Sequence, residues 1–230
     1  MPFASSVNVG SIYSDADWMD TGAGAASHSE NFSEATSRFD LFGELGESWG
    51  GCVEARPTPY DVTDDIPVSG TPDTKFVPMF APDEPDDTNA DAAGYDNYVN
   101  NYISDYGGTC PTPEQVCLVF NKKKGTCTTS APATLPVAEA QSRVCKYSGS
   151  TPSSDTGPNF GCSTPPILPL TQNKTIVEAA ITSLVANGYT NIGEGTMWGW
   201  RVLSPTAPFT DGRSYGAAEN KKILVIMTDG

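Results

Sequence analysis

The clearest hydrophobic periodicity of the chain lies in residues 166–230. Apolar side chains recur every three or four residues through 176–185, which predicts a helix with one apolar face. Thr171 or Asn173, just before this stretch, can cap the helix at its N-terminus. Gly188 suits a left-handed C-terminal stop, so we expect the helix to end near that residue.

A turn that contains Thr190 leads to a second predicted helix at about 193–203, which Ser204-Pro205 ends. The residues at 223–227, Ile-Leu-Val-Ile-Met, then form an uninterrupted apolar run. A short run of this kind is typical of a central parallel strand that is buried on both faces. Helix, helix and buried strand in this order predict an α/β fold with a doubly wound sheet.

Residues 1–10 hold a further predicted strand, made of the apolar and small polar residues at 3–9 and closed by Gly10. A chain that opens directly on a strand looks like a fragment, and we expect it to be a piece of a longer protein. Residues 11–165 are rich in Asp, Pro, Gly and Ser and show little sustained periodicity. Short elements are expected there at 37–45, 76–80, 95–103 and 116–121, with ordered loops elsewhere. The chain thus divides into 1–10, an insertion at 11–165, and 166–230.

The formal net charge of the chain is −15, and it is unevenly spread. Residues 1–105 hold 20 acids and 3 bases, whereas residues 106–230 hold 8 acids and 10 bases. An acidic chain is repelled by nucleic-acid backbones and by anionic lipid surfaces, so we expect neither as a partner. The aliphatic run at 223–227 is far shorter than the roughly 20 residues that cross a bilayer, so no membrane span is expected within the chain.

All six cysteines fall in the predicted insertion: Cys52, Cys110, Cys117, Cys127, Cys145 and Cys162. No pair has Cys-x-x-Cys spacing and His28 is the sole histidine, so a zinc site or a thioredoxin-type redox pair is poorly supported. An even number of cysteines in a loop-rich segment predicts up to three disulfides and an oxidising compartment. The pairing stays open, and so does the alternative of unpaired thiols in a cytosolic protein.

Residues 46–50, Gly-Glu-Ser-Trp-Gly, match the Gly-x-Ser-x-Gly pattern of the α/β-hydrolase nucleophile elbow. An elbow needs a hydrophobic strand before the serine and a helix after it, whereas Pro57 and Pro59 follow here. The base histidine should lie downstream, but His28 lies upstream of Ser48. We therefore expect a non-enzymatic protein and keep a serine hydrolase that uses Ser48 as the least favoured alternative.

Asp87-x-Asn89-x-Asp91 has the spacing with which a calcium loop begins. Ala92 stands where such a loop needs glycine, and Tyr98 stands where it needs a bidentate glutamate. Solvated acidic loops explain the pattern better than a dedicated site. An extracellular structural or surface protein that Ca²⁺ stabilises nevertheless stays open as an alternative function, ahead of the serine hydrolase.

A hydroxyl and a carboxylate come together in the fold expected for residues 166–230. Asp229 lies just past the predicted strand at 223–227, and ligands of open α/β sheets bind at the carboxyl ends of the strands. Thr190, in a turn after a helix, can reach the same edge. Both groups are hard oxygen donors that suit Mg²⁺, although Asp229 can equally be a turn residue and Thr190 a local cap.

Residues 222–230, Lys-Ile-Leu-Val-Ile-Met-Thr-Asp-Gly, resemble the strand that carries the last metal-site motif of von Willebrand factor A (vWA) domains. Residues 2–10, 49–57, 76–85 and 198–205 resemble stretches of the vWA domain in TadG-like proteins of Flp/Tad pilus assembly. The resemblance runs along nearly the whole chain. It implies a vWA-like (Rossmann-like) doubly wound sheet, here incomplete, with a long disulfide-stapled insertion.

The resemblance also implies a metal-ion-dependent adhesion site in which Thr190 and Asp229 are ligands. The family's Asp-x-Ser-x-Ser motif is absent from this chain. It would lie upstream of residue 1, as would a membrane anchor, so we expect Mg²⁺ to bind the intact protein and this chain only poorly.

The function that the resemblance implies is non-catalytic protein binding in pilus assembly. The metal would help to capture a protein partner, most simply another pilus-assembly component. The expected location is the periplasm or the bacterial cell surface, with the full-length protein anchored in the inner membrane.

Overall fold

The computed structural model describes residues 6–10, 18–20, 32, 36–86, 100–111, 114–133, 135–153, 156–185 and 190–228. Its strands are β1 (Ser6–Asn8), β2 (Cys52–Glu54), β3 (Gln115–Asn121) and β4 (Thr126–Pro132). Its α-helices are α1 (Arg38–Glu44), α2 (Val137–Ser142), α3 (Lys174–Thr182) and α4 (Ile192–Leu203). Short 3₁₀ turns form η3 (Tyr60–Val62), η4 (Pro72–Thr74) and η6 (Cys145–Tyr147).

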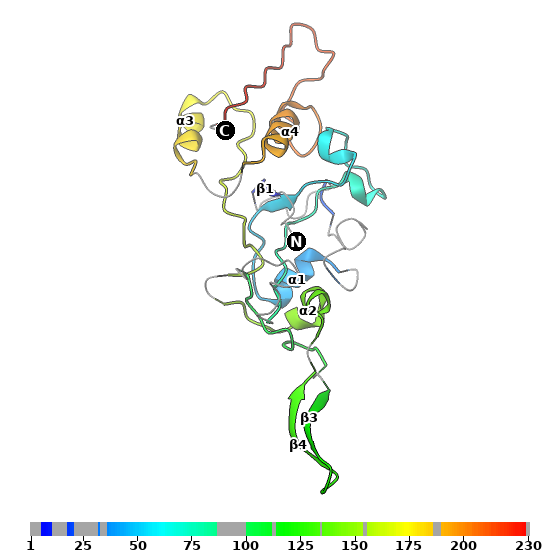
Figure 1. Cartoon of the computed structure of the whole chain (residues 1–230). Coiled ribbons are helices and arrows are strands. Elements are labelled where there is room, and N and C mark those ends of the chain that lie inside the picture. The colour runs from blue at the N-terminus through cyan, green and yellow to red at the C-terminus, as the bar shows by residue number, and fades with distance from the viewer. Residues whose placement is uncertain are drawn as a thin grey trace.

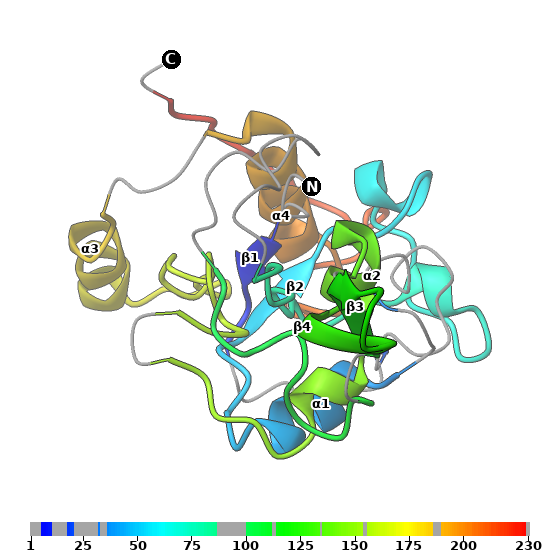
Figure 2. The same cartoon turned by 60° about the horizontal axis from the view of Figure 1, so that its bottom comes forward.

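The elements are spread along an elongated molecule. The β3–β4 hairpin projects from one end, and α3, α4 and the C-terminal segment lie at the other (Figure 1). β1 and α1 lie between these two ends (Figure 1), and Figure 2 shows the hairpin from its projecting end. The part of the chain that the sequence assigns to an insertion therefore occupies the middle of the molecule and one of its ends.

Two small antiparallel sheets form the regular β-structure of the described residues. β1 pairs with β2, with Val7 opposite Val53, and β3 pairs with β4. The segment at 76–80 extends the first sheet, because Glu54 N donates to Val77 O and Met79 N donates to Cys52 O, each at 2.8 Å. The structure thus combines helices and strands, as predicted, in a small antiparallel arrangement.

Local sequence signals placed the two C-terminal helices correctly. Oδ1 of Asn173 accepts hydrogen bonds from the amides of Thr175 and Ile176, so Asn173, and not Thr171, caps α3. α3 ends at Thr182, short of the predicted stop at Gly188, which lies outside the described residues. The second helix agrees with the prediction at both ends. α4 begins at Ile192, next to the predicted start near residue 193, and it ends directly before Ser204-Pro205.

The segment at 223–227 differs from the expected buried strand. It is extended, but it belongs to no strand, and its side chains range from 42% exposed at Leu224 to 90% exposed at Met227. A central strand needs neighbours on both edges and helices on both faces. Among the described residues no strand pairs with this segment, so its apolar side chains stay at the surface.

The hydrophobic core lies mainly within the predicted insertion. Its aromatic centre is Phe80, whose ring packs edge-on against Phe32, Phe42 and Tyr147 at centroid distances of 5.1–5.8 Å. Trp198 of α4 joins this core, with its ring centroid 4.9 Å from that of Phe76. The other buried members are Val9, Trp18, Met19, Leu41, Leu45, Trp49, Val53, Tyr102, Ile103 and Phe209. Residues 11–165 therefore contribute packed core as well as loops.

Three disulfides staple the structure and leave no free cysteine. Cys52–Cys162 joins residues 110 apart, Cys110–Cys145 joins residues 35 apart, and Cys117–Cys127 crosses the β3–β4 hairpin. The prediction of three disulfides is confirmed, and the pairing that the sequence left open is resolved. None of the described helices has the length and apolar character that a membrane crossing requires.

Candidate functional site

A groove lies between the start of α4 and the C-terminal segment. Its volume is about 340 Å³. The residues that line it are Thr190, Asn191, Ile192, Gly195, Thr196, Leu224, Val225, Ile226, Met227 and Thr228. We call it the Thr190 groove.

The local sequence builds both walls of the Thr190 groove. Oδ1 of Asn191 accepts a 3.0 Å hydrogen bond from the amide of Glu194 and so caps α4 directly after Thr190. On the other wall, Leu224 packs against Gly199, where an added Cβ atom would lie 2.6 Å from Leu224 Cδ1. Glycine at this position therefore allows the C-terminal segment to approach the helix closely.

A lysine ties the base of the C-terminal segment to the residues that follow α4. Nζ of Lys222 donates hydrogen bonds to the carbonyl oxygens of Leu203 and Arg213. The segment is thereby held beside the helix although it belongs to no sheet.

The Thr190 groove offers hydroxyl groups on an apolar surface. Thr190, Thr196 and Thr228 contribute the hydroxyls. Val225 and Met227, which are 74% and 90% exposed, contribute apolar side chains. Surfaces of this kind suit the binding of another macromolecule, because covering exposed apolar side chains removes them from water and makes a favourable contribution to the free energy of binding.

The structure places one of the two predicted metal ligands in this groove. Thr190 is exposed there, and Thr228, on the opposite wall, directly precedes Asp229 in the chain. Asp229 itself lies outside the described residues, so its pairing with Thr190 stays a prediction.

The fit of Mg²⁺ to the described residues is partial. Hydroxyl oxygens are hard donors of the kind that Mg²⁺ accepts. Among the residues that the structure describes, however, no group of three or more His, Cys, Asp or Glu side chains is arranged to hold a metal ion. The donor set is therefore incomplete in this part of the chain.

The other sequence candidates fall in different places. Ser48 is exposed between α1 and β2, so a helix precedes it and a strand follows, which is the reverse of a nucleophile elbow. The calcium-like residues Asp87, Asn89 and Asp91 lie outside the described residues, as does His28.

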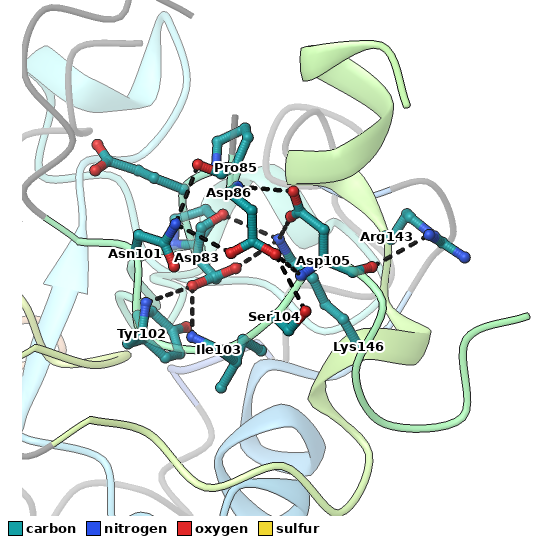
Figure 3. A network of polar contacts seen from close by, with 12 residues as sticks. Asp83, Pro85, Asp86, Asn101, Tyr102, Ile103, Ser104, Asp105, Arg143 and Lys146 are labelled. Atoms are coloured by element: carbon teal, nitrogen blue, oxygen red, sulfur yellow. Dashed lines mark hydrogen bonds and ion pairs between the residues drawn. The ribbon is translucent and has the colours of Figure 1, made fainter. Parts of the chain in front are cut away.

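Sequence reasoning missed a buried charge network that joins Asp83, Asp105 and Lys146, which we call the Lys146 network (Figure 3). Nζ of Lys146 lies 2.8 Å from Oδ2 of Asp83 and 3.2 Å from Oδ1 of Asp105. The side chains of Lys146 and Asp83 are fully buried, and that of Asp105 is 6% exposed.

The remaining oxygens of the Lys146 network are occupied by backbone amides. Oδ1 of Asp83 accepts hydrogen bonds from the amides of Tyr102 (2.6 Å) and Ile103 (2.9 Å), as Figure 3 shows. Oδ2 of Asp105 accepts one from the amide of Asp86 at 2.7 Å. Burial raises the pKa of Asp83 to about 6, although Lys146 and these hydrogen bonds oppose the shift.

A second buried cluster surrounds Phe76 with two guanidinium groups. Cζ of Arg56 lies 4.7 Å from the centre of the Phe76 ring, and Cζ of Arg201 lies 5.1 Å from it. Burial, together with the charge of Arg201, lowers the pKa of Arg56 to about 10. The nitrogens of Arg56 donate to the carbonyl oxygens of Thr63, Asp65 and Thr74, so the cluster holds loops together.

One sequence signal could have pointed to the buried Arg56, although not to Lys146 or Arg201. Residues 1–105 contain only three bases, and two of them, Arg38 and Arg56, are 1% and 2% exposed. A rare base in an acidic segment is therefore a candidate for a buried structural charge, such as Arg38 beside Glu54.

Comparison of the chain with protein-family models, curated proteins and solved structures finds no match. Functional inference therefore depends on the chemistry of the residues and on the motif resemblance.

Proposed function

We propose that this chain is a non-catalytic, protein-binding, vWA-like part of a TadG-like pilus-assembly protein. The observation that carries the proposal is the Thr190 groove, in which Thr190 and the segment leading to Asp229 face each other. The expected fold and the motif resemblance both suggest that Thr190 and Asp229 belong to one site, and the groove brings Thr190 close to the segment that leads to Asp229. The apolar side chains of the groove supply contact area for a protein partner.

The intact protein would complete the metal site. An Asp-x-Ser-x-Ser motif upstream of residue 1 would add the oxygen ligands that this chain lacks, and the bound Mg²⁺ would supply a position for an acidic side chain of the partner. The residues that this chain would contribute are Thr190 and Asp229.

The same proposal accounts for the segment at 223–227. In a doubly wound sheet this segment would pair with strands of the intact protein, and its apolar side chains would then be buried. Its exposed side chains here are what such a strand would present without its neighbours. Three disulfides support an oxidising location, either the periplasm or the cell surface.

Calorimetric titration with Mg²⁺ tests this function. A longer natural chain that includes the upstream motif should bind Mg²⁺, and T190A and D229A should each abolish the binding. D211A removes an exposed aspartate outside the groove and should leave the affinity unchanged. Residues 1–230 alone should bind no tighter than roughly millimolar, which corresponds to about −4 kcal/mol.

Two results would contradict the proposal. The first is a longer chain that does not bind Mg²⁺. The second is micromolar binding by residues 1–230 that survives T190A, because the site would then lie elsewhere.

A further inference from the structure

We propose that Lys146 and Asp83 condense to an intramolecular isopeptide bond, an amide between Lys146 Nζ and Asp83 Cγ, with Asp105 as the acid–base residue. This modification is independent of the Thr190 groove and of the function proposed for it.

The first support is the position of the amine. Nζ of Lys146 lies 2.8 Å from Oδ2 of Asp83, and both side chains are fully buried. Because Oδ2 is bonded to Cγ, the nitrogen is held next to the carbon that it would attack. Fixing two reacting groups in this way replaces an encounter in solution and removes a large part of the barrier.

The second support is the environment of the other carboxylate oxygen. Oδ1 of Asp83 accepts hydrogen bonds from two consecutive backbone amides, those of Tyr102 and Ile103 (Figure 3). When an amine attacks Cγ, negative charge develops on Oδ1. Two preorganised N–H donors at 2.6 and 2.9 Å stabilise that charge as an oxyanion hole does.

The third support is a carboxylate that can accept the proton of the amine. Oδ1 of Asp105 lies 3.2 Å from Nζ of Lys146. Asp105 is itself held in place, because its Oδ2 accepts from the amide of Asp86 and its own amide donates to Oδ2 of Asp86. An adjacent base of this kind activates a lysine as a nucleophile.

The charge balance of the site favours the reactive protonation state. Two carboxylates around one ammonium leave one buried negative charge, which a single added proton neutralises. Burial raises the pKa of Asp83 to about 6, so the protonated carboxyl that would be attacked is reached closer to neutral pH than in an ordinary aspartate. Tyr102 and Tyr147 are 4% and 0% exposed and help to exclude water from the site.

The reaction balances without any further reagent. The ammonium of Lys146 gives one proton to the carboxylate of Asp105, and the free amine attacks Cγ of the protonated Asp83. The tetrahedral intermediate loses the Oδ2 hydroxyl, which takes a second proton from nitrogen by way of Asp105 and leaves as water. The products are one amide, one water and a protonated Asp105, and no oxidant or reductant takes part.

Intact-mass measurement of the reduced chain of residues 1–230 tests the proposal. The chain should be lighter than its sequence mass by about 18 Da, the mass of one water. Digestion should then yield a branched peptide that contains both Lys146 and Asp83, with no cleavage after Lys146. K75R, which changes a lysine outside the network, should show the same loss of mass.

Three variants assign the chemistry. K146R and D83A should keep the full sequence mass, because each removes one partner of the bond. D105N should keep both partners but form the bond more slowly by about 10²–10⁴-fold, the usual contribution of general acid–base catalysis.

Two outcomes would overturn the proposal, and neither depends on whether a variant folds. One is a wild-type chain that carries all three disulfides and nevertheless has its full sequence mass after reduction. The other is a loss of one water that persists in K146R, since dehydration at a different aspartate would then explain it.

Discussion

The indole nitrogen of Trp198 donates a 2.7 Å hydrogen bond to Oε1 of Glu194, one turn earlier on α4. The same oxygen lies 3.8 Å from Nη1 of Arg201. Burial raises the pKa of Glu194, and both the Trp198 hydrogen bond and the Arg201 charge oppose that shift. The protonation state of the Glu194 carboxyl is therefore coupled to Trp198, whose ring packs in the core.

Glu194 should make the stability of the protein depend on pH. Because its folded-state pKa lies above the ordinary value of 4.5, the native state binds more protons than the unfolded state in the interval above that value. The free energy of unfolding contributed by this residue should therefore fall as pH rises through that interval. E194Q, which keeps an oxygen acceptor for Trp198, should flatten this dependence in urea unfolding series.

E178Q is the matched control, because Glu178 is an exposed glutamate on a helix. It should leave the slope unchanged. An E194Q protein with the same slope as wild type would contradict the assignment.

The disulfides should stabilise the fold to different extents. In the chain-entropy model a bridge contributes more when it closes a longer loop, about 4.7 kcal/mol near 100 residues against about 2.7 kcal/mol near ten. Cys52–Cys162 joins residues 110 apart and Cys117–Cys127 residues 10 apart. C52A/C162A should therefore lower the free energy of unfolding by about 2 kcal/mol more than C117A/C127A.

Thiol titration of the denatured wild type, prepared under oxidising conditions, provides the control and should find no free cysteine. A hairpin variant that loses more stability than C52A/C162A would show that loop closure does not dominate.

Arg38 and Glu54 form a buried ion pair whose loss should be severe. Nη1 of Arg38 lies 3.3 Å from Oε1 of Glu54, and the two side chains are 1% and 7% exposed. R38M leaves a buried carboxylate without its counter-charge and should cost about 3–5 kcal/mol. R38M/E54L removes both charges and should recover much of that loss, as thermal or urea unfolding would reveal. An R38M protein as stable as wild type would mean that the ion pair contributes nothing to the free energy of unfolding.

The segment at 223–227 should promote self-association of this chain. Its backbone pairs with no strand among the residues that the structure describes, and with its exposed apolar side chains it can serve as a template for strand addition. V225K/M227K should lower the fraction of oligomer in sedimentation velocity experiments. V62K/I66K, at two positions that are 60% and 58% exposed elsewhere, should have little effect. If both double variants lowered the fraction of oligomer equally, the added charge would act through general solubility and not through the segment at 223–227.

Local signals in the sequence predicted local structure well. Asn173 caps α3, and Ser204-Pro205 follows the end of α4, because capping and helical periodicity depend only on residues a few positions apart. The same kind of signal predicted a short regular element at 116–121, where the strand β3 lies.

Burial and pairing depend on residues far away in the chain, and there the sequence was less informative. The apolar run at 223–227 predicted side chains that favour burial, but burial needs covering elements that these residues do not encode. Lys146 and Asp83 are 63 positions apart, and no spacing rule joins them. Thr190 was singled out from its position in a turn and by resemblance, whereas the groove that it lines became apparent only in the fold.

The Cys52–Cys162 bond determines how the protein would respond to a mechanical pull on its two ends. Tension would follow the chain to Cys52, cross the sulfur bridge and continue from Cys162, so the residues between them would carry no load. Since an extended residue spans roughly 3.3–3.6 Å, the bridge shortens the fully stretched chain by roughly 370 Å. The hairpin, the other two disulfides and the Lys146 network all lie inside this shielded part. A force that unravels β1, α1, α3 and α4 would therefore not be transmitted through them.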